Sequence, residues 1–182
     1  MSKNGWKVKG IEPNTNARKS AINNFSLDVS EESQLFKFNE NSFDVITMWH
    51  VLEHVYNLDK HLTQIKKILR KEGRLVIALP NADSMDASIY KNFWAAYDVP
   101  RHLHHFNQSS LTKLMEKYGF EIIETKPMVF DSFYISMLSE KYKRGKINYL
   151  NAFFKGLKTD LYGLLDKKYY SSLIYILKLK NT

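Results

Sequence analysis

Two short apolar segments with a helical pattern between them constrain the fold of this chain more than any other feature. The first covers residues 43–48 (FDVITM) and the second covers residues 75–79 (LVIAL). Both are apolar at consecutive positions, which is typical of strands buried on both faces in a parallel sheet. Between them, Leu58 is followed by apolar residues four, seven and eleven positions later, which predicts a helix. A strand, a crossover helix and a second strand form the unit of an α/β fold.

The same alternation continues on both sides of this unit. Residues 6–11 (WKVKGI) and 25–29 (FSLDV) predict short strands around a helix at 15–23, and the helix from Leu58 should end in a left-handed cap at Gly73. After a long loop over 82–108, we expect a helix capped by Ser109, a strand over 120–125 and a last strand over 172–179. The pattern predicts a doubly wound α/β sheet in one domain, residues 1–182, with a helical insertion at about 133–166.

Composition excludes several classes of protein. The chain has no cysteine, which rules out disulfides and thiolate chemistry. The N-terminus lacks the apolar core of a signal peptide, and no apolar run reaches the roughly 20 residues of a membrane span, so we expect a cytoplasmic protein. The net charge is +8, and from Lys126 onward 11 Lys and Arg face 4 Asp and Glu, a difference of +7. A solvated lysine-rich face explains this excess, and no nucleic-acid-binding motif accompanies it.

The stretch 49–54 (WHVLEH) carries two imidazoles and a carboxylate. Its letters match H-x-x-E-H, a zinc-protease signature in which two histidines bind the ion and the glutamate is the general base. That site needs a helix long enough to hold both histidines and a further ligand from another helix. Here a buried strand runs directly into the motif, so the sequence favours a turn at the end of a strand.

Four longer segments occur in a recognisable order: GWKVKGIEPN, NENSFDVITMWHVLEHV, LRKEGRLVIALPN and DVPRHLHHFNQSSLTKLMEKYGFEI. Over nearly the whole chain they resemble class I S-adenosylmethionine (SAM)-dependent methyltransferases, within them the group of the ubiquinone-pathway and glycan-cluster methyltransferases. The resemblance implies a mostly parallel Rossmann-like sheet with an antiparallel last strand, and SAM as cofactor at the carboxyl ends of the strands. It also implies methyl transfer to an oxygen or nitrogen of a small-molecule, glycan or lipid-linked acceptor.

The resemblance assigns four residues to cofactor binding. Glu12, after the family's second strand, would accept hydrogen bonds from the ribose hydroxyls, and Glu31 falls in the acidic loop near the adenine. Trp49 and His50 would flank the methionine end of SAM. A solvated glutamate before a proline turn is the alternative for Glu12, and a capping or core imidazole is the alternative for His50.

The segment 98–106 (DVPRHLHHF) resembles the element that closes over the substrate in this family. Arg101 would bind an anionic group of the acceptor, and His102 or His105 would act as general base, with His50 as a further catalytic candidate. Alternatively, Leu103 and Phe106 only anchor the loop and leave the imidazoles partly exposed.

Some relatives bind a divalent ion through E-x-x-E-H at the position of residues 50–54. In this chain His50 replaces the first glutamate of that motif, beside Glu53 and His54. An imidazole is a softer ligand than a carboxylate, which disfavours a hard ion such as Mg²⁺. We therefore assign no metal site from the sequence.

The family's glycine-rich turn after its first strand has no counterpart in this sequence. We therefore expect an N-terminally shortened member whose sheet lacks that strand, with weakened SAM binding.

A catalytically inactive remnant that serves as a binding or scaffold protein is the second hypothesis, and a homodimer is a further option. Membrane-surface contact is a third hypothesis, since helices within 133–166 carry an apolar face beside lysines. At helical spacing such a face is more often part of the core. Its members are Leu150, Phe153, Phe154, Leu157, Leu161, Leu164 and Leu165.

Overall fold

The computed structural model describes residues 4–180, which form two compact units that divide between Ser42 and Phe43. In the first unit, strands β1 (Gly10–Ile11) and β2 (Val29–Ser30) form a short parallel pair. Helix α1 (Thr15–Phe25) connects the two strands. It begins after Asn14 because the side chain of Asn14 caps the helix by accepting from two backbone N–H groups. The helix confirms the prediction at 15–23.

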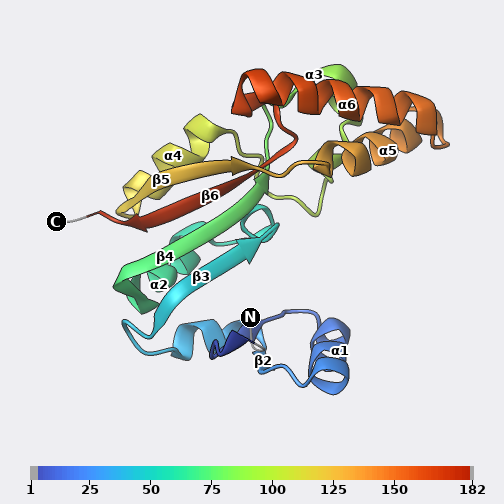
Figure 1. Ribbon diagram of the computed structural model, residues 1–182. Helices are drawn as coiled ribbons and strands as arrows, with labels where there is room; N and C mark the ends of the chain where they lie inside the picture. Colours follow the sequence, from blue (N-terminus) through green and yellow to red (C-terminus); the bar gives the residue numbers. More distant parts are fainter. Residues whose placement is uncertain (1–3, 181–182) are drawn as a thin grey trace. The chain divides into compact units, whose positions relative to one another are not determined.

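A four-stranded sheet organises the second unit, in the order β3-β4-β6-β5 (Figure 1). Its strands are β3 (Phe43–Trp49), β4 (Leu69–Pro80), β5 (Phe120–Pro127) and β6 (Ser172–Leu179). β3 and β4 are parallel, whereas β6 is antiparallel to both β4 and β5. This mixed sheet confirms the predicted fold class, including its antiparallel last strand.

Helices α2 (Leu58–Ile68) and α4 (Gln108–Lys117) lie on the same side of this sheet (Figure 1). Their apolar stripes supply Leu62 and Met115 to one core cluster, which also contains Leu75 of β4 and Leu177 of β6, all of them at most 2% exposed. Burying such side chains is the main stabilising contribution to the unit, about 1.5–3 kcal/mol for each.

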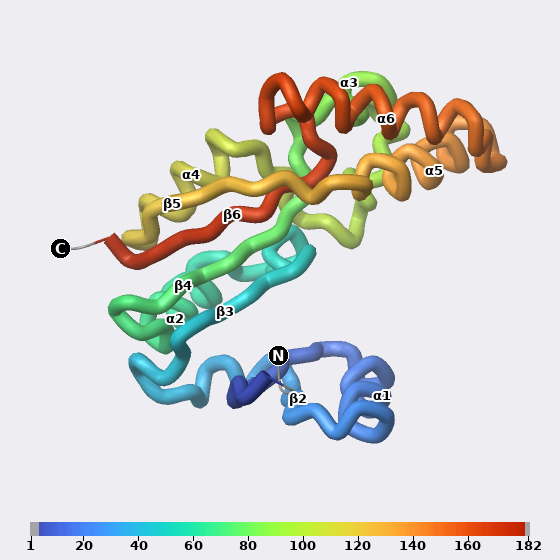
Figure 2. Tube along the Cα trace, in the orientation of Figure 1, coloured from blue at the N-terminus to red at the C-terminus, as the bar shows by residue number. Residues whose placement is uncertain are grey.

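Two helices lie between β5 and β6, in the region where the sequence predicts a helical insertion. Helices α5 (Asp131–Arg144) and α6 (Tyr149–Leu165) lie side by side as a hairpin (Figure 2). The turn begins at Gly145, whose φ of 74° is one that glycine adopts without strain. Within residues 4–180, no helix combines the length and apolarity that crossing a bilayer requires.

The region predicted as a loop over 82–108 contains a helix, α3 (Met85–Tyr90). It is held by a buried network in which the indole N–H of Trp94 donates to the Asp86 carboxylate at 2.9 Å and Ser171 donates to the same group. Burial raises the pKa of Asp86. Since Trp94 is 2% exposed, tertiary packing stabilises a segment whose local sequence does not predict a helix.

Four local predictions are wrong. β1 covers only the last two residues of the expected strand 6–11, and residue 25 ends α1 where the next strand was expected. Gly73 caps no helix: α2 ends at Ile68, and Gly73 lies inside β4. A Cβ at Gly73 would lie 2.8 Å from Leu69 Cδ1 and 3.0 Å from the Asp44 carbonyl oxygen, so close strand approach explains this glycine. Asn107, not Ser109, caps α4.

Candidate active site

The WHVLEH segment is the turn that follows β3. His50 has a φ of 50°, in the left-handed region that non-glycine residues rarely adopt, and its backbone N–H donates to the Ala78 carbonyl at 3.0 Å. The following Leu52–His54 is a single 3₁₀ turn. This short turn lacks the long helix of a zinc-protease site, so that alternative is excluded.

Glu53 joins this turn to the segment 98–106. Its backbone carbonyl accepts from Leu103 N–H at 2.8 Å and from His104 N–H at 3.2 Å. Its side chain is 1% exposed, with Oε1 3.2 Å from Nδ1 of His50, and Oε2 has no hydrogen-bond partner among residues 4–180. A buried carboxylate oxygen without a partner is costly, which is typical of a site that a ligand completes.

The hydrogen bond that His50 donates to Glu53 raises the pKa of His50 above its ordinary 6.5, and the charges of Glu53 and Asp131 act in the same direction. Burial of the ring opposes this shift and is outweighed. A raised pKa favours the imidazolium form. His50 is therefore suited to donating a hydrogen bond or stabilising negative charge, and it is a poorer general base.

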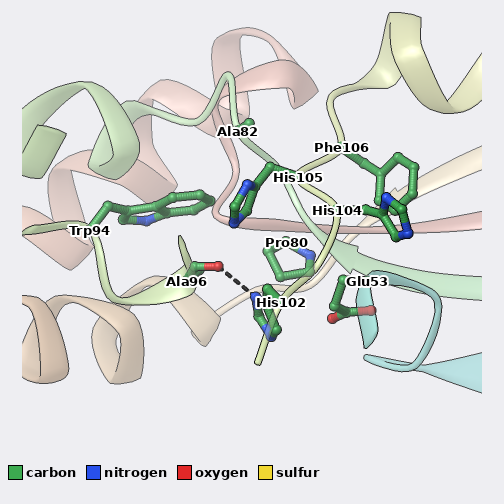
Figure 3. A pocket seen from close by; sticks show the side chains of 9 residues that line it. All are labelled: Glu53, Pro80, Ala82, Trp94, Ala96, His102, His104, His105 and Phe106. Atoms are coloured by element: carbon green, nitrogen blue, oxygen red, sulfur yellow. Dashed lines mark hydrogen bonds between the residues drawn. The ribbon is translucent and has the colours of Figure 1, made fainter. Parts of the chain in front are cut away.

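His102 is the histidine whose Nε2 is best placed to accept a proton from a substrate. Its Nδ1–H donates to the Ala96 carbonyl at 2.7 Å (Figure 3). A carbonyl can only accept, so a neutral His102 ring carries its lone pair on Nε2. In Figure 3 the ring lies below Pro80, with Ala96 on one side and Glu53 on the other. The ring is thus fixed in one orientation, as a positioned base requires.

His104 and His105 donate a hydrogen bond through Nε2, whereas His102 donates through Nδ1. Nε2–H of His105 donates to the Tyr97 carbonyl at 2.8 Å, and Nε2–H of His104 donates to the Val55 carbonyl at 3.0 Å. Both line a narrow pocket with His102 and Trp94 (Figure 3), where the centroids of the His102 and His105 rings lie 6.5 Å apart.

A larger cavity of about 210 Å³ opens beside the turn after β3. It brings together three residues that the sequence singled out, His50, Arg101 and His102, but not His105. Nη2 of the exposed Arg101 lies 2.7 Å from Oδ1 of Asp98. The remaining lining residues come from α5 and the neighbouring loops: Pro80, Ala95, Ala96, Asp98, Asp131, Tyr134, Ile135, Leu138 and Tyr142. A cavity of this size accommodates the reacting group of an acceptor.

Sequence reasoning missed the contribution of α5 to this cavity. Tyr134 and Tyr142 lie on that helix, more than 30 residues after Arg101, and both side chains are over half exposed. No motif marks them. The sequence indicates them only by their spacing, since two aromatic residues eight positions apart on one helix lie about two turns apart on the same side.

In the first unit, Glu12 and Glu31 directly follow the paired strands β1 and β2, at the register set by the pair Ile11 and Ser30. Glu12 Oε1 accepts from Asn14 N–H at 2.8 Å, and Oε2 makes no hydrogen bond within the described range 4–180. A carboxylate with a free oxygen after a parallel strand suits the hydroxyls of a ribose. Trp49, which is 52% exposed, ends β3 in the second unit.

A cluster of possible metal ligands also lies at the turn. Ligand atoms of Glu53, His54 and His102 all lie within 4.8 Å of one another. Nδ1–H of His54 donates to the Arg101 carbonyl at 2.9 Å, so each of the two imidazoles, when neutral, carries its lone pair on Nε2, as metal-ligating histidines do. Nε2 of His102 also lies 3.9 Å from Oδ2 of Asp98. The structure thus groups His102, and not His50, with Glu53 and His54. Two nitrogens and one carboxylate suit a transition metal better than Mg²⁺.

The order β3-β4-β6-β5, with parallel β3 and β4 and an antiparallel β6, defines an α/β protein with a Rossmann-like sheet. A family model described as a methyltransferase domain matches residues 1–125. The chain belongs to this methyltransferase family.

Solved structures agree with this fold. A SAM-dependent methyltransferase from Archaeoglobus fulgidus is 18% identical, with a TM-score of 0.63 over 97% of this chain and 78% of that chain. The phosphoethanolamine N-methyltransferase 2 of Haemonchus contortus, solved with S-adenosyl-L-methionine, is 19% identical, with a TM-score of 0.59 over 99% of this chain and 45% of that chain.

Among curated proteins, an uncharacterised protein of Methanocaldococcus jannaschii is 30% identical over 93 residues. The match spans 51% of this chain and 37% of that relative.

Proposed function

We propose that this protein transfers a methyl group from SAM to an oxygen or nitrogen of a small-molecule, glycan or lipid-linked acceptor, within the ubiquinone-pathway and glycan-cluster group. The observation that carries the proposal is the cavity beside the turn after β3, where His50, Arg101 and His102 meet. In open α/β sheets, ligands bind outside the carboxyl ends of the strands, which is where this turn lies.

The residues that would hold SAM fit its chemistry. The Glu12 carboxylate would accept from the ribose hydroxyls, Glu31 would lie toward the adenine, and Trp49 and His50 would flank the methionine end. When bound, SAM supplies a methyl group that its sulfonium already makes electrophilic. The protein therefore has to align the acceptor and remove its proton.

His102 would remove that proton through Nε2, because its Nδ1–H is committed to the Ala96 carbonyl. His50, with its raised pKa, would hold the acceptor as a hydrogen-bond donor. Arg101 would bind an anionic group of the acceptor, since its side chain is exposed at the rim and can bind a carboxylate or phosphate through two nitrogens. His105 is the second candidate base, from the narrow pocket.

Isothermal titration with SAM, followed by transfer of labelled methyl groups to a panel of hydroxyl and amine acceptors, tests this function. We expect saturable SAM binding that Glu12→Gln weakens and that Glu116→Gln, a glutamate of α4, leaves unchanged. Absence of SAM binding by the folded wild-type protein would refute methyl transfer and favour a noncatalytic binding protein.

A further inference from the structure

Helix α6 presents one apolar face to solvent. Leu150, Phe154, Leu157 and Leu161 follow one another at spacings of four, three and four residues, which places them on one side of the helix. Their exposed fractions are 73%, 62%, 37% and 53%. Leu164 and Leu165 extend this surface with 74% and 82%. We call these six residues the α6 outer face. The expectation that it belongs to the core is wrong.

Small residues fix the orientation of α6. Its buried side consists of Ala152, Gly156, Thr159 and Gly163. A Cβ at Gly156 would lie 2.8 Å from Phe133 Cδ1, and one at Gly163 would lie 2.7 Å from the Tyr170 ring. Leucine and phenylalanine cannot occupy these positions, so the helix cannot rotate to bury its outer face. The packing of the hairpin therefore keeps the α6 outer face exposed.

The helical hairpin that carries this face has an excess of positive charge. Residues 131–168 contain eight Lys and Arg and four Asp and Glu. The four acids are bonded within the unit: Asp131 accepts from Ser172, Glu140 from Lys155, Asp160 from Ser132, and Asp166 from Lys168. By contrast, four basic side chains are exposed and, within residues 4–180, form no ion pair. They are Lys141, Lys143, Lys146 and Lys158.

We propose that the α6 outer face binds an anionic lipid surface, with its apolar side chains at the headgroup boundary and the flanking lysines on the phosphates. A helix of 17 residues is about 25 Å long, which suits a helix lying in the plane of an interface. A second copy of this chain is the poorer occupant, because it would bring the same unpaired lysines face to face.

The hairpin also connects this surface to the candidate active site. α5, the partner of α6, supplies Tyr134, Ile135 and Leu138 to the wall of the cavity. A protein that binds a membrane through one helix of the hairpin holds the cavity close to that membrane. If the protein transfers methyl groups as proposed, the position of the cavity near the membrane favours a lipid-linked acceptor over a freely diffusing one.

Vesicle sedimentation without SAM or acceptor tests the surface separately from methyl transfer. We expect the wild-type protein to sediment with vesicles of equal parts phosphatidylcholine and phosphatidylglycerol, but not with phosphatidylcholine alone, and salt should weaken the binding. The double variant Phe154→Ser with Leu165→Ser should bind at least about tenfold more weakly. The matched control is Phe25→Ser with Tyr56→Ser, whose side chains are 70% and 90% exposed elsewhere, and it should bind like the wild type.

Fluorescence provides a second readout that does not depend on serine variants. Because the chain has no cysteine, Leu164→Cys and Phe25→Cys can each carry one environment-sensitive dye. Anionic vesicles should blue-shift the dye at position 164 and leave the dye at position 25 unchanged. No sedimentation of the wild type, equal binding of the Phe154/Leu165 variant, or a homodimer that this variant abolishes would each overturn the proposal. None of these outcomes bears on SAM binding.

Discussion

The Nδ1 of His50 lies 3.2 Å from Oε1 of Glu53, a carboxylate with 1% of its surface exposed. Replacing the carboxylate by an amide in Glu53→Gln should lower the pKa of His50, because the hydrogen bond that the carboxylate accepts from His50 is the largest cause of the raised pKa. NMR titration of the His50 ring protons measures this shift. Glu116→Gln is the control, and an unchanged His50 pKa in Glu53→Gln would contradict the electrostatic assignment.

The same pair makes stability depend on pH. A raised pKa in the folded state gives a contribution that is complete below the unfolded pKa, near 6.5, and is lost as pH rises through the folded pKa. We expect the free energy of unfolding of the wild type, relative to His50→Gln, to decrease over that interval. Urea titrations of both proteins at several pH values provide the measurement. A difference that stays constant with pH would disagree with the raised pKa.

His102→Ala should reduce the rate of methyl transfer to a hydroxyl acceptor by about 100-fold or more, as loss of a general base does. His105→Ala should have a much smaller effect, because its ring does not line the larger cavity. Initial rates as a function of pH separate a base from a structural residue, since the missing base also removes a limb of the profile. Equal losses in both variants would leave the two histidines undistinguished and contradict this prediction.

Arg101→Ala should raise KM for an anionic acceptor more than it lowers kcat, because the guanidinium lies at the rim beside Asp98 and would bind the acceptor before and during transfer alike. Arg101→Lys should restore part of the affinity, limited by the loss of the two-pronged geometry. Steady-state kinetics with an anionic acceptor and its neutral analogue give the comparison. An equal effect on both acceptors would argue against charge recognition.

Zinc should inhibit transfer by occupying Nε2 of His102 together with His54 and Glu53, whose ligand atoms lie within 4.8 Å of one another. A chelator should restore activity, and His54→Ala should reduce the inhibition. Zinc titration of the histidine NMR signals reads the binding without turnover. Mg²⁺ serves as the control ion and should leave those signals in place.

Gly163→Ala should destabilise the protein by about 1–3 kcal/mol, because the new Cβ would lie 2.7 Å from the Tyr170 ring. Intrinsic helix propensity alone would give the opposite sign by about 1 kcal/mol. Lys158→Ala, an exposed position on the same helix, is the control and should change stability by less than about 0.5 kcal/mol. Chemical denaturation decides the sign.

Periodicity alone predicted the elements whose apolar faces are continuous. The strand at 43–48 and the closing strand β6 are as expected, because the apolar run of each strand is enough to predict a buried strand without information on distant residues. α3 was missed because its six residues depend on a distant partner network around Asp86 and Trp94. Gly73 was misassigned because its reason is the approach of a neighbouring strand.

The candidate site follows the same division. The sequence pointed to His50, Arg101 and His102, which meet in one cavity, because each belongs to a recognisable segment. It could not rank His102 above His105, because the distinction depends on which ring nitrogen meets a backbone carbonyl. For α6 the apolar spacing was read correctly, but whether a partner covers it depends on the three-dimensional packing of small residues on its other side.

The two ends of the α5–α6 hairpin are neighbours, since Pro127 of β5 pairs with Leu173 of β6. Two adjacent antiparallel strands can be joined by a few residues, so the sheet does not require the helices that interrupt it here. The length and sequence of the hairpin can therefore change without breaking the pairing of β5 with β6, and such a change would alter the wall of the cavity while leaving the sheet intact.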